Sequence, residues 1–136
     1  MILQPVCTED EIARMVHRFY EKVRADAQLG PIFDAQIAPE QWPVHLRKMV
    51  DFWSSLLRGT ARYSGTPMPR HAALPGLSAT LFQRWLALFV DTTAELGNPD
   101  MEQRANELAR RIARSLWLGY QTCNFPERLP TDLSVA

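Results

Sequence analysis

Apolar residues recur at intervals of three and four positions over most of this chain, a spacing that places them on one face of an α-helix. The first stretch begins at Thr8 and Glu11, which form a capping-box pattern in which each side chain bonds the other residue's backbone N–H. The apolar positions that follow are Ile12, Met15, Val16, Phe19, Tyr20 and Val23. The pattern predicts a helix that Leu29-Gly30-Pro31 interrupts, with a corner beginning at Ile32-Phe33.

A second helix is predicted after Pro39 and Pro43, because proline suits the first turn of a helix, and Gly59 ends it. One stripe of this helix carries His45, Met49, Phe52, Trp53 and Leu56. From residue 59 to residue 76, glycines and prolines interrupt the helical spacing of apolar residues, although residues 71–74 can form one helical turn. A stretch of this length is usually functional or a linker, and nothing on either side indicates a separate domain.

Two more long helices are predicted in the second half of the chain. Ser78 can cap the third, which Gly97 stops, and Pro99 begins the fourth. The third carries Leu81, Trp85, Leu88, Phe89 and Leu96 on one face, and the fourth carries Met101, Leu108, Ile112, Leu116 and Tyr120. With no useful β-alternation and no internal repeat, the prediction is an all-α single domain over residues 1–136, with a core over about 9–121 and a loose tail over 122–136.

Composition excludes several classes of function. Lysine plus arginine and aspartate plus glutamate each number 15, so a net charge of zero gives no electrostatic case for nucleic acid or an anionic membrane. No apolar run reaches the roughly 18 residues that span a bilayer, and residues 1–10 do not resemble a secretory signal. Cys7 and Cys123 are isolated, so we expect reduced thiols in a cytoplasmic protein.

Motifs of common catalytic sites are also missing. The chain has no HExxH, GxSxG, P-loop or GxGxxG sequence. Ser54 and Ser55 lie in a predicted helix without an obvious base, which leaves a hydrolase without support. Two histidines, His45 and His71, without a third clustered ligand make a poor zinc site.

The same two histidines suggest a different site. Helical proteins hold haem with an imidazole on the iron, opposed by a pocket of aromatic and polar groups. His71 lies outside any amphipathic pattern, so core packing does not explain it, and a surface loop is the alternative. His45 lies on an apolar face, where a core histidine is the alternative. Tyr20 and Trp85 are either core residues or hydrogen-bond donors to a ligand.

Over about residues 9–121 the chain resembles the truncated haemoglobins, and most closely their third group. The paired-glycine motifs of the first two groups are absent, as is usual for the third. The resemblance rests on the order and spacing of Phe19-Tyr20, Pro31-Ile32-Phe33, Trp42-Pro43-Val44-His45-Leu46, Met49, Asp51-Phe52-Trp53, Tyr63-Ser64-Gly65, His71 with Leu74, and Phe82-Gln83-Arg84-Trp85-Leu86.

This resemblance implies a truncated globin-like two-over-two helical sandwich that encloses haem b. His71 would be the proximal ligand to iron, and Phe33 would pack on the porphyrin. The pocket would be walled by Met49, Phe52, Trp53, Leu74 and Phe89. Candidates for the haem propionates are Lys48, Tyr63 and Arg70. On the distal side the resemblance implies Tyr20, His45 and Trp85.

The implied function is the binding of dioxygen and other diatomic ligands, namely nitric oxide, carbon monoxide and cyanide. Donors on Tyr20 and Trp85 would each contribute about 1 kcal/mol or more, which slows ligand release and suits ligand chemistry better than transport. Nitric oxide dioxygenase or peroxidase-like activity would need an electron donor, and His45 and Tyr20 could move a proton.

Three alternatives stay open at this point. His45 could swing out or bind the iron itself in the ligand-free form. The protein could be a reversible binder or sensor of gas without turnover, or a helical interaction module without a cofactor, its aromatic stripes buried against each other. We expect a monomer, with a dimer as the alternative.

Overall fold

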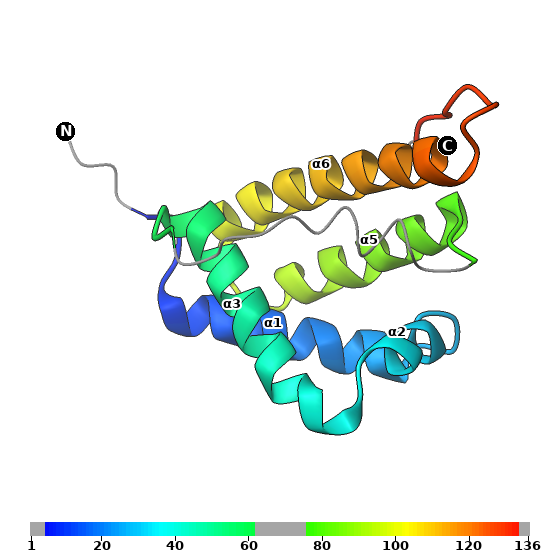
Figure 1. Ribbon diagram of the computed structural model, residues 1–136. Helices are drawn as coiled ribbons and strands as arrows, with labels where there is room; N and C mark the ends of the chain where they lie inside the picture. The colour runs from blue at the N-terminus through cyan, green and yellow to red at the C-terminus, as the bar shows by residue number, and fades with distance from the viewer. Residues whose placement is uncertain (1–4, 62–75, 134–136) are drawn as a thin grey trace.

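The computed structural model describes residues 5–61 and 76–133, which are mostly helical (Figure 1). The elements are α1 (Glu9–Ala25), α2 (Gly30–Gln36), a 3-10 turn η1 (Pro39–Gln41), α3 (Trp42–Arg58), α5 (Ala79–Ala94) and α6 (Pro99–Asn124). Within those ranges there is no strand, and no helix is long and apolar enough to cross a membrane. The helical turn predicted at residues 71–74 lies outside the described residues.

The long helices are arranged as two pairs. α5 and α6 run side by side in opposite directions, and α3 packs across α1 (Figure 1). α1 also packs on α5, which joins the two pairs through α1. The prediction of an all-α, two-over-two arrangement of four long helices is confirmed, and the predicted corner at Ile32-Phe33 is the short helix α2.

The helix ends form as the sequence indicates. The Thr8 hydroxyl accepts a hydrogen bond from the Glu11 N–H at 3.1 Å, and the Glu11 carboxylate accepts one from the Thr8 N–H at 2.9 Å. The Ser78 hydroxyl caps α5 by accepting from the Leu81 N–H. Gly59 ends α3 in the left-handed region, with φ +68°. These local bonds fix where the aromatic faces of the helices begin and end.

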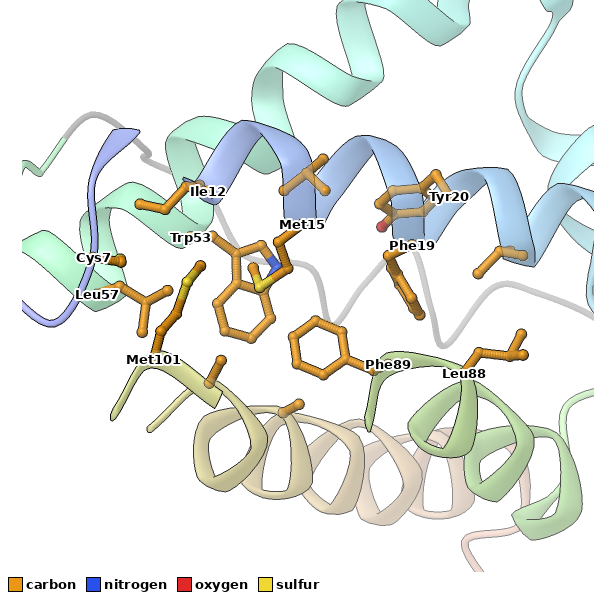
Figure 2. Close-up of a cluster of buried hydrophobic side chains, with 14 of the residues drawn as sticks. Cys7, Ile12, Met15, Phe19, Tyr20, Trp53, Leu57, Leu88, Phe89 and Met101 are labelled. Carbon is orange, nitrogen blue, oxygen red and sulfur yellow. The ribbon is translucent and has the colours of Figure 1, made fainter. Parts of the chain in front are cut away.

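The core has a large cluster between the two helix pairs and a smaller one at the far end of α6. Figure 2 shows the larger cluster, in which Trp53 and Phe89 lie side by side below α1. All six apolar positions predicted for α1 are buried. In α6 the predicted Met101, Leu116 and Tyr120 are buried, but Leu108 and Ile112 are only partly buried, and the buried face also contains the small residues Ala105, Ala109 and Ala113.

The buried side of α3 also differs from the prediction. Trp53 and Leu57 are buried, whereas Leu56 is 39% exposed. The residues of the predicted stripe therefore divide into two sets, because Trp53 points towards α1 and α5 while Met49, Phe52 and Leu56 follow a neighbouring strip. Met49 and Phe52 are partly buried, so this strip is an apolar surface that the described helices cover incompletely.

Residues 125–133, within the predicted loose tail, pack against α6. The Gln121 side chain donates to the Thr131 carbonyl at 2.9 Å and accepts from the Thr131 N–H at 2.9 Å. Arg114 pairs with Asp132, and Leu133 is buried in the smaller cluster. Residues 125–133 therefore fold back on α6, held by polar bonds and one apolar anchor.

Gly30 of α2 packs directly against the backbone of α1. A Cβ atom at this position would lie 2.6 Å from the Arg24 carbonyl oxygen, and backbone cannot yield as a side chain can. We expect Gly30→Ala to lower the free energy of unfolding by about 1–3 kcal/mol, since the helices must move apart. Denaturant unfolding measures the loss. Gln28→Ala, at an exposed site in the same turn, is the control, and equal stability of both variants would contradict the close approach.

Candidate functional site

Tyr20 lies at the centre of a cluster of rings from three elements, α1, α2 and α3. Its ring centroid is 5.1 Å from that of Phe19 on the same helix and 6.1 Å from that of Phe33 on α2. It is also 5.8 Å from the ring of Trp42 and 5.2 Å from that of His45, both on α3. α1, the α2 corner and the first turns of α3 thus bring a phenol and an imidazole into direct contact, edge to face at 86°.

Trp85 joins this cluster through Phe19. The Phe19 and Trp85 rings meet edge to face at 5.3 Å, and Trp85 stacks on Phe89 at 5.8 Å. Phe89 in turn stacks on Trp53 at 5.0 Å. Through Phe19, these ring contacts connect six of the predicted site residues: Phe33, His45, Tyr20, Trp85, Phe89 and Trp53. Figure 2 shows the Phe19 and Phe89 rings side by side.

An apolar pocket lies between α2, α5 and α6. Phe33 and Trp85 line it, and its volume is about 60 Å³. Its other walls are Leu29, Ile32, Leu77, Leu81, Phe82, Ala113 and Leu116. A cavity of this size can hold a diatomic molecule but not a porphyrin, since a water molecule occupies about 30 Å³. Two of the predicted site residues, Phe33 and Trp85, therefore line the same pocket.

Burial determines the chemistry of the Tyr20 hydroxyl. Loss of solvation raises the pKa of this phenol far above its usual value, so the group stays protonated at any physiological pH. Within the described residues, the contacts of Tyr20 are those with surrounding rings. The arrangement thus presents a neutral O–H donor in an apolar environment, where a hydrogen bond to a ligand is stronger than in water.

An ion pair supports the pocket from outside. Arg84 precedes Trp85 in the sequence. Its guanidinium donates to one carboxylate oxygen of Asp26, from Nε at 2.8 Å and from Nη2 at 2.7 Å. Asp26 also accepts from the N–H groups of Gln28 and Leu29. Burial opposes ionisation of Asp26, but the bonds from Leu29 and Arg84 outweigh it, and its pKa is lowered. This ion pair fixes the turn between α1 and α2 to the pocket-bearing part of α5.

The remaining predicted site residues are distributed unevenly. Met49 and Phe52 lie on the incompletely covered strip of α3, and Lys48 is exposed one turn from His45. Tyr63, Arg70, His71 and Leu74 lie outside the described residues. In the described ranges no group of three or more His, Cys, Asp or Glu side chains is close enough to hold a metal ion.

Sequence reasoning missed three contributors to this site. Trp42 is buried against both Tyr20 and His45, although it was quoted only as part of a motif. Phe19 connects Tyr20 with Trp85, and Phe82 lines the pocket. A helical wheel could have suggested Phe19, but the contacts of Trp42 and Phe82 depend on how separate helices pack.

Neither cysteine belongs to this site, but Cys7 should make the free energy of unfolding depend on pH. Burial, with the charge of Glu11, raises the pKa of the Cys7 thiol from 9.0 to about 11. Between these values the unfolded chain loses a proton that the folded chain keeps. The free energy of unfolding should therefore fall with rising pH, by at most about 1.4 kcal/mol per pH unit for one proton.

Denaturant titrations from pH 8 to pH 11 check this expectation. Cys7→Ala should remove the Cys7 part of the slope, which leaves the part due to buried Tyr20, whose pKa is raised in the same direction. Cys123→Ala is the matched control at an exposed site. A Cys7→Ala protein with the parent's slope would show that the thiol is not buried as described.

Comparisons with known proteins identify the family and the fold of the chain. The model of the family described as "Bacterial-like globin" matches residues 3–115. A group 3 truncated hemoglobin of Campylobacter jejuni subsp. jejuni is 36% identical over 115 residues, which cover 80% of this chain and 91% of that relative. The crystal structure of a group III truncated hemoglobin from Campylobacter jejuni superposes with a TM-score of 0.76 at 34% identity, over 85% of this chain and 92% of that one.

These matches confirm the resemblance inferred from the sequence and the truncated globin fold. Globins are haem proteins that bind diatomic ligands, so family membership carries the cofactor and the class of ligand with it. The chain belongs to the bacterial-like globin family, as a homologue of the group III truncated hemoglobins.

Proposed function

We propose that the chain binds haem b through His71 and uses it for chemistry on a diatomic ligand, either oxidation of nitric oxide or breakdown of peroxide. The observation that supports this proposal best is the buried Tyr20 hydroxyl, packed against His45 and linked through Phe19 to Trp85. We propose that this phenol, imidazole and indole face the bound diatomic ligand, to which they would supply hydrogen-bond donors and a proton carrier.

The described residues fit a flat apolar cofactor. Phe33 and Trp85 line an apolar pocket, and Met49 and Phe52 belong to the strip of α3 that the described helices cover incompletely. Such a strip is costly in water and is favourable against a porphyrin. We propose that these side chains, together with Leu74, form the walls of the haem site. Trp53 and Phe89 would complete the walls from behind.

The haem propionates need cations or hydrogen-bond donors at the edge of the site. Lys48 is exposed on α3, one turn from His45. A side chain that binds a propionate at the protein surface must be exposed in this way. We propose Lys48, Tyr63 and Arg70 for this role.

The other histidines support His71 as the axial ligand. His17 is exposed on the outer face of α1. His45 lies with its ring against Tyr20 and Trp42, on the side that we propose for the diatomic ligand. His71 is the remaining histidine of the chain, so we propose that its imidazole would hold the haem iron.

The chain's own residues then have separate roles. Haem, when bound, supplies the iron that holds the ligand and exchanges electrons with it. Tyr20 and Trp85 donate hydrogen bonds to the partly negative ligand, which retains it long enough to react. The surrounding rings exclude water. His45, half-buried at the margin of the cluster, can carry a proton to or from the ligand.

Retention favours ligand chemistry over delivery, because a transporter must release its ligand readily. The cycle would take electrons from a separate donor. We place the protein in the cytoplasm as a monomer, where Cys7, buried, and Cys123, exposed, remain free thiols. A reversible gas sensor would use the same donors without turnover.

Absorption spectra of the purified, haem-supplemented protein test the proposal. We expect a Soret band that shifts when carbon monoxide is added to the ferrous form or cyanide to the ferric form. Mixing the dioxygen-loaded protein with nitric oxide should then give one nitrate per haem. Absence of a Soret band would contradict haem binding and favour a cofactor-free helical module. A normal spectrum without nitrate formation or peroxide consumption would favour the sensor.

A further inference from the structure

We propose that Trp42 is a positioning residue that holds the His45 imidazole against Tyr20, and that the Arg24 guanidinium holds Trp42 in turn. This inference rests on the proposed function, in which Tyr20 and His45 face the bound diatomic ligand. It assigns the orientation of the distal imidazole to a tryptophan on the same helix and an arginine on α1.

The three rings of Tyr20, Trp42 and His45 are in mutual contact. The centroids of Trp42 and His45 are 5.4 Å apart at 88°, and those of Trp42 and Tyr20 are 5.8 Å apart at 58°. With the contact of 5.2 Å between Tyr20 and His45, each ring touches the other two. Removal of one ring therefore leaves space into which either of the others can move.

Helix geometry explains why Trp42 bears on His45 in particular. The two residues lie three positions apart in α3, and helical side chains lean towards the N-terminus of their helix. The imidazole of residue 45 thus leans over the turn that residue 42 occupies. Since Trp42 is only 3% exposed, it is a fixed support and not a surface side chain.

Trp42 is itself held by its ring faces and not by its N–H group. Among the described residues the buried indole nitrogen has no hydrogen-bond partner. The Arg24 guanidinium lies over the ring, 4.4 Å from its centroid, and also approaches Asp34 of α2 at 3.9 Å. A cation on the face of tryptophan is attractive, so the contact connects the position of His45 to α1 and α2.

A positioning role for Trp42 and simple core packing predict different results when Trp42 is removed. If Trp42 merely fills space, its removal lowers stability and leaves the ligand environment unchanged. If it positions His45, its removal changes the number of orientations that the imidazole adopts near the ligand. One aromatic contact corresponds to about a fivefold change in such a population.

The test uses the haem-loaded protein with carbon monoxide as the probe, because the infrared stretch of bound carbon monoxide reports the polar groups around it. We expect Trp42→Ala to redistribute the stretching bands and to change the carbon monoxide association rate by about fivefold. Trp42→Phe, which keeps a ring at this position, should stay close to the parent. Arg24→Gln should move the bands in the same direction as Trp42→Ala, but less.

Trp117→Ala is the matched control. Trp117 is another buried tryptophan whose N–H lacks a partner in the described part of the chain, but it packs in the smaller cluster, with Phe82 and Tyr120. It should lower stability without redistributing the bands. Equal band changes in Trp42→Ala and Trp117→Ala, or none in either, would overturn the positioning role.

Two further outcomes separate the levels of the inference. If Trp42→Ala does not fold, Arg24→Gln decides, and parent-like bands in that variant would overturn the proposal. If Tyr20→Phe speeds ligand release while every Trp42 and Arg24 variant matches the parent, the proposed function stands and the positioning role fails. A protein without haem would overturn the proposed function and the positioning role with it.

Discussion

His71→Gly should release haem during gel filtration, and added imidazole should restore both the cofactor and the Soret band. The expected effect is large because an axial nitrogen contributes a bond that apolar contacts do not replace. Glycine leaves a space that free imidazole can fill, so rescue distinguishes a lost ligand from a lost fold. The measurement is the ratio of Soret to protein absorbance after gel filtration, with and without imidazole.

His17→Gly is the control, because His17 is exposed on the outer face of α1. It should keep its haem. A His71→Gly protein that retains haem with the parent's ferrous spectrum would refute the axial assignment. If His45→Gly lost its haem and imidazole restored it, His45 would be the iron ligand in place of His71.

Removal of the distal donors should speed the release of dioxygen. Each donor in a dry pocket is worth about 1 kcal/mol or more, so Tyr20→Phe with Trp85→Phe should raise the dissociation rate by a factor of about ten to a hundred. Tyr20→Phe keeps a ring of the same shape against Phe19, Phe33 and His45. The packing is therefore retained while the hydroxyl is lost. Stopped-flow displacement of dioxygen by carbon monoxide gives the rate.

Tyr120→Phe provides the comparison for this experiment. Tyr120 is buried too, but in the smaller cluster, stacked on Trp117. The dioxygen dissociation rate of the Tyr120→Phe protein should equal that of the parent. If neither Tyr20→Phe nor Trp85→Phe speeds release, hydrogen bonding by these residues does not retain the ligand, and delivery becomes a better description than chemistry.

Large side chains made much of this fold predictable. The six apolar positions of α1 and the Thr8 cap follow directly from spacing, because a buried helical face of big residues repeats at intervals of three and four. The same signal misleads where small residues do the packing. Ala105, Ala109 and Ala113 lie on the buried face of α6, yet alanine is common on both buried and exposed helix surfaces.

Periodicity also resolves a face less finely than the structure does. It predicted Leu56 for the stripe that Trp53 belongs to, although Leu57 is the buried neighbour. The site depends on such details. Trp42 precedes most of the apolar pattern of α3, and its contacts with Tyr20 and Arg24 arise only when α1 and α3 cross.

The alanines of α6 have a consequence for how this protein can change. Ala113 lines the pocket together with Trp85, and Ala109 belongs to the core cluster that contains Phe89. A larger side chain at Ala109 would displace α5 and with it the indole that faces the proposed ligand, and one at Ala113 would fill part of the pocket beside that indole. Selection on gas chemistry would thus act on methyl groups that donate no hydrogen bond, and a variant at one of these sites would alter affinity with every polar residue intact.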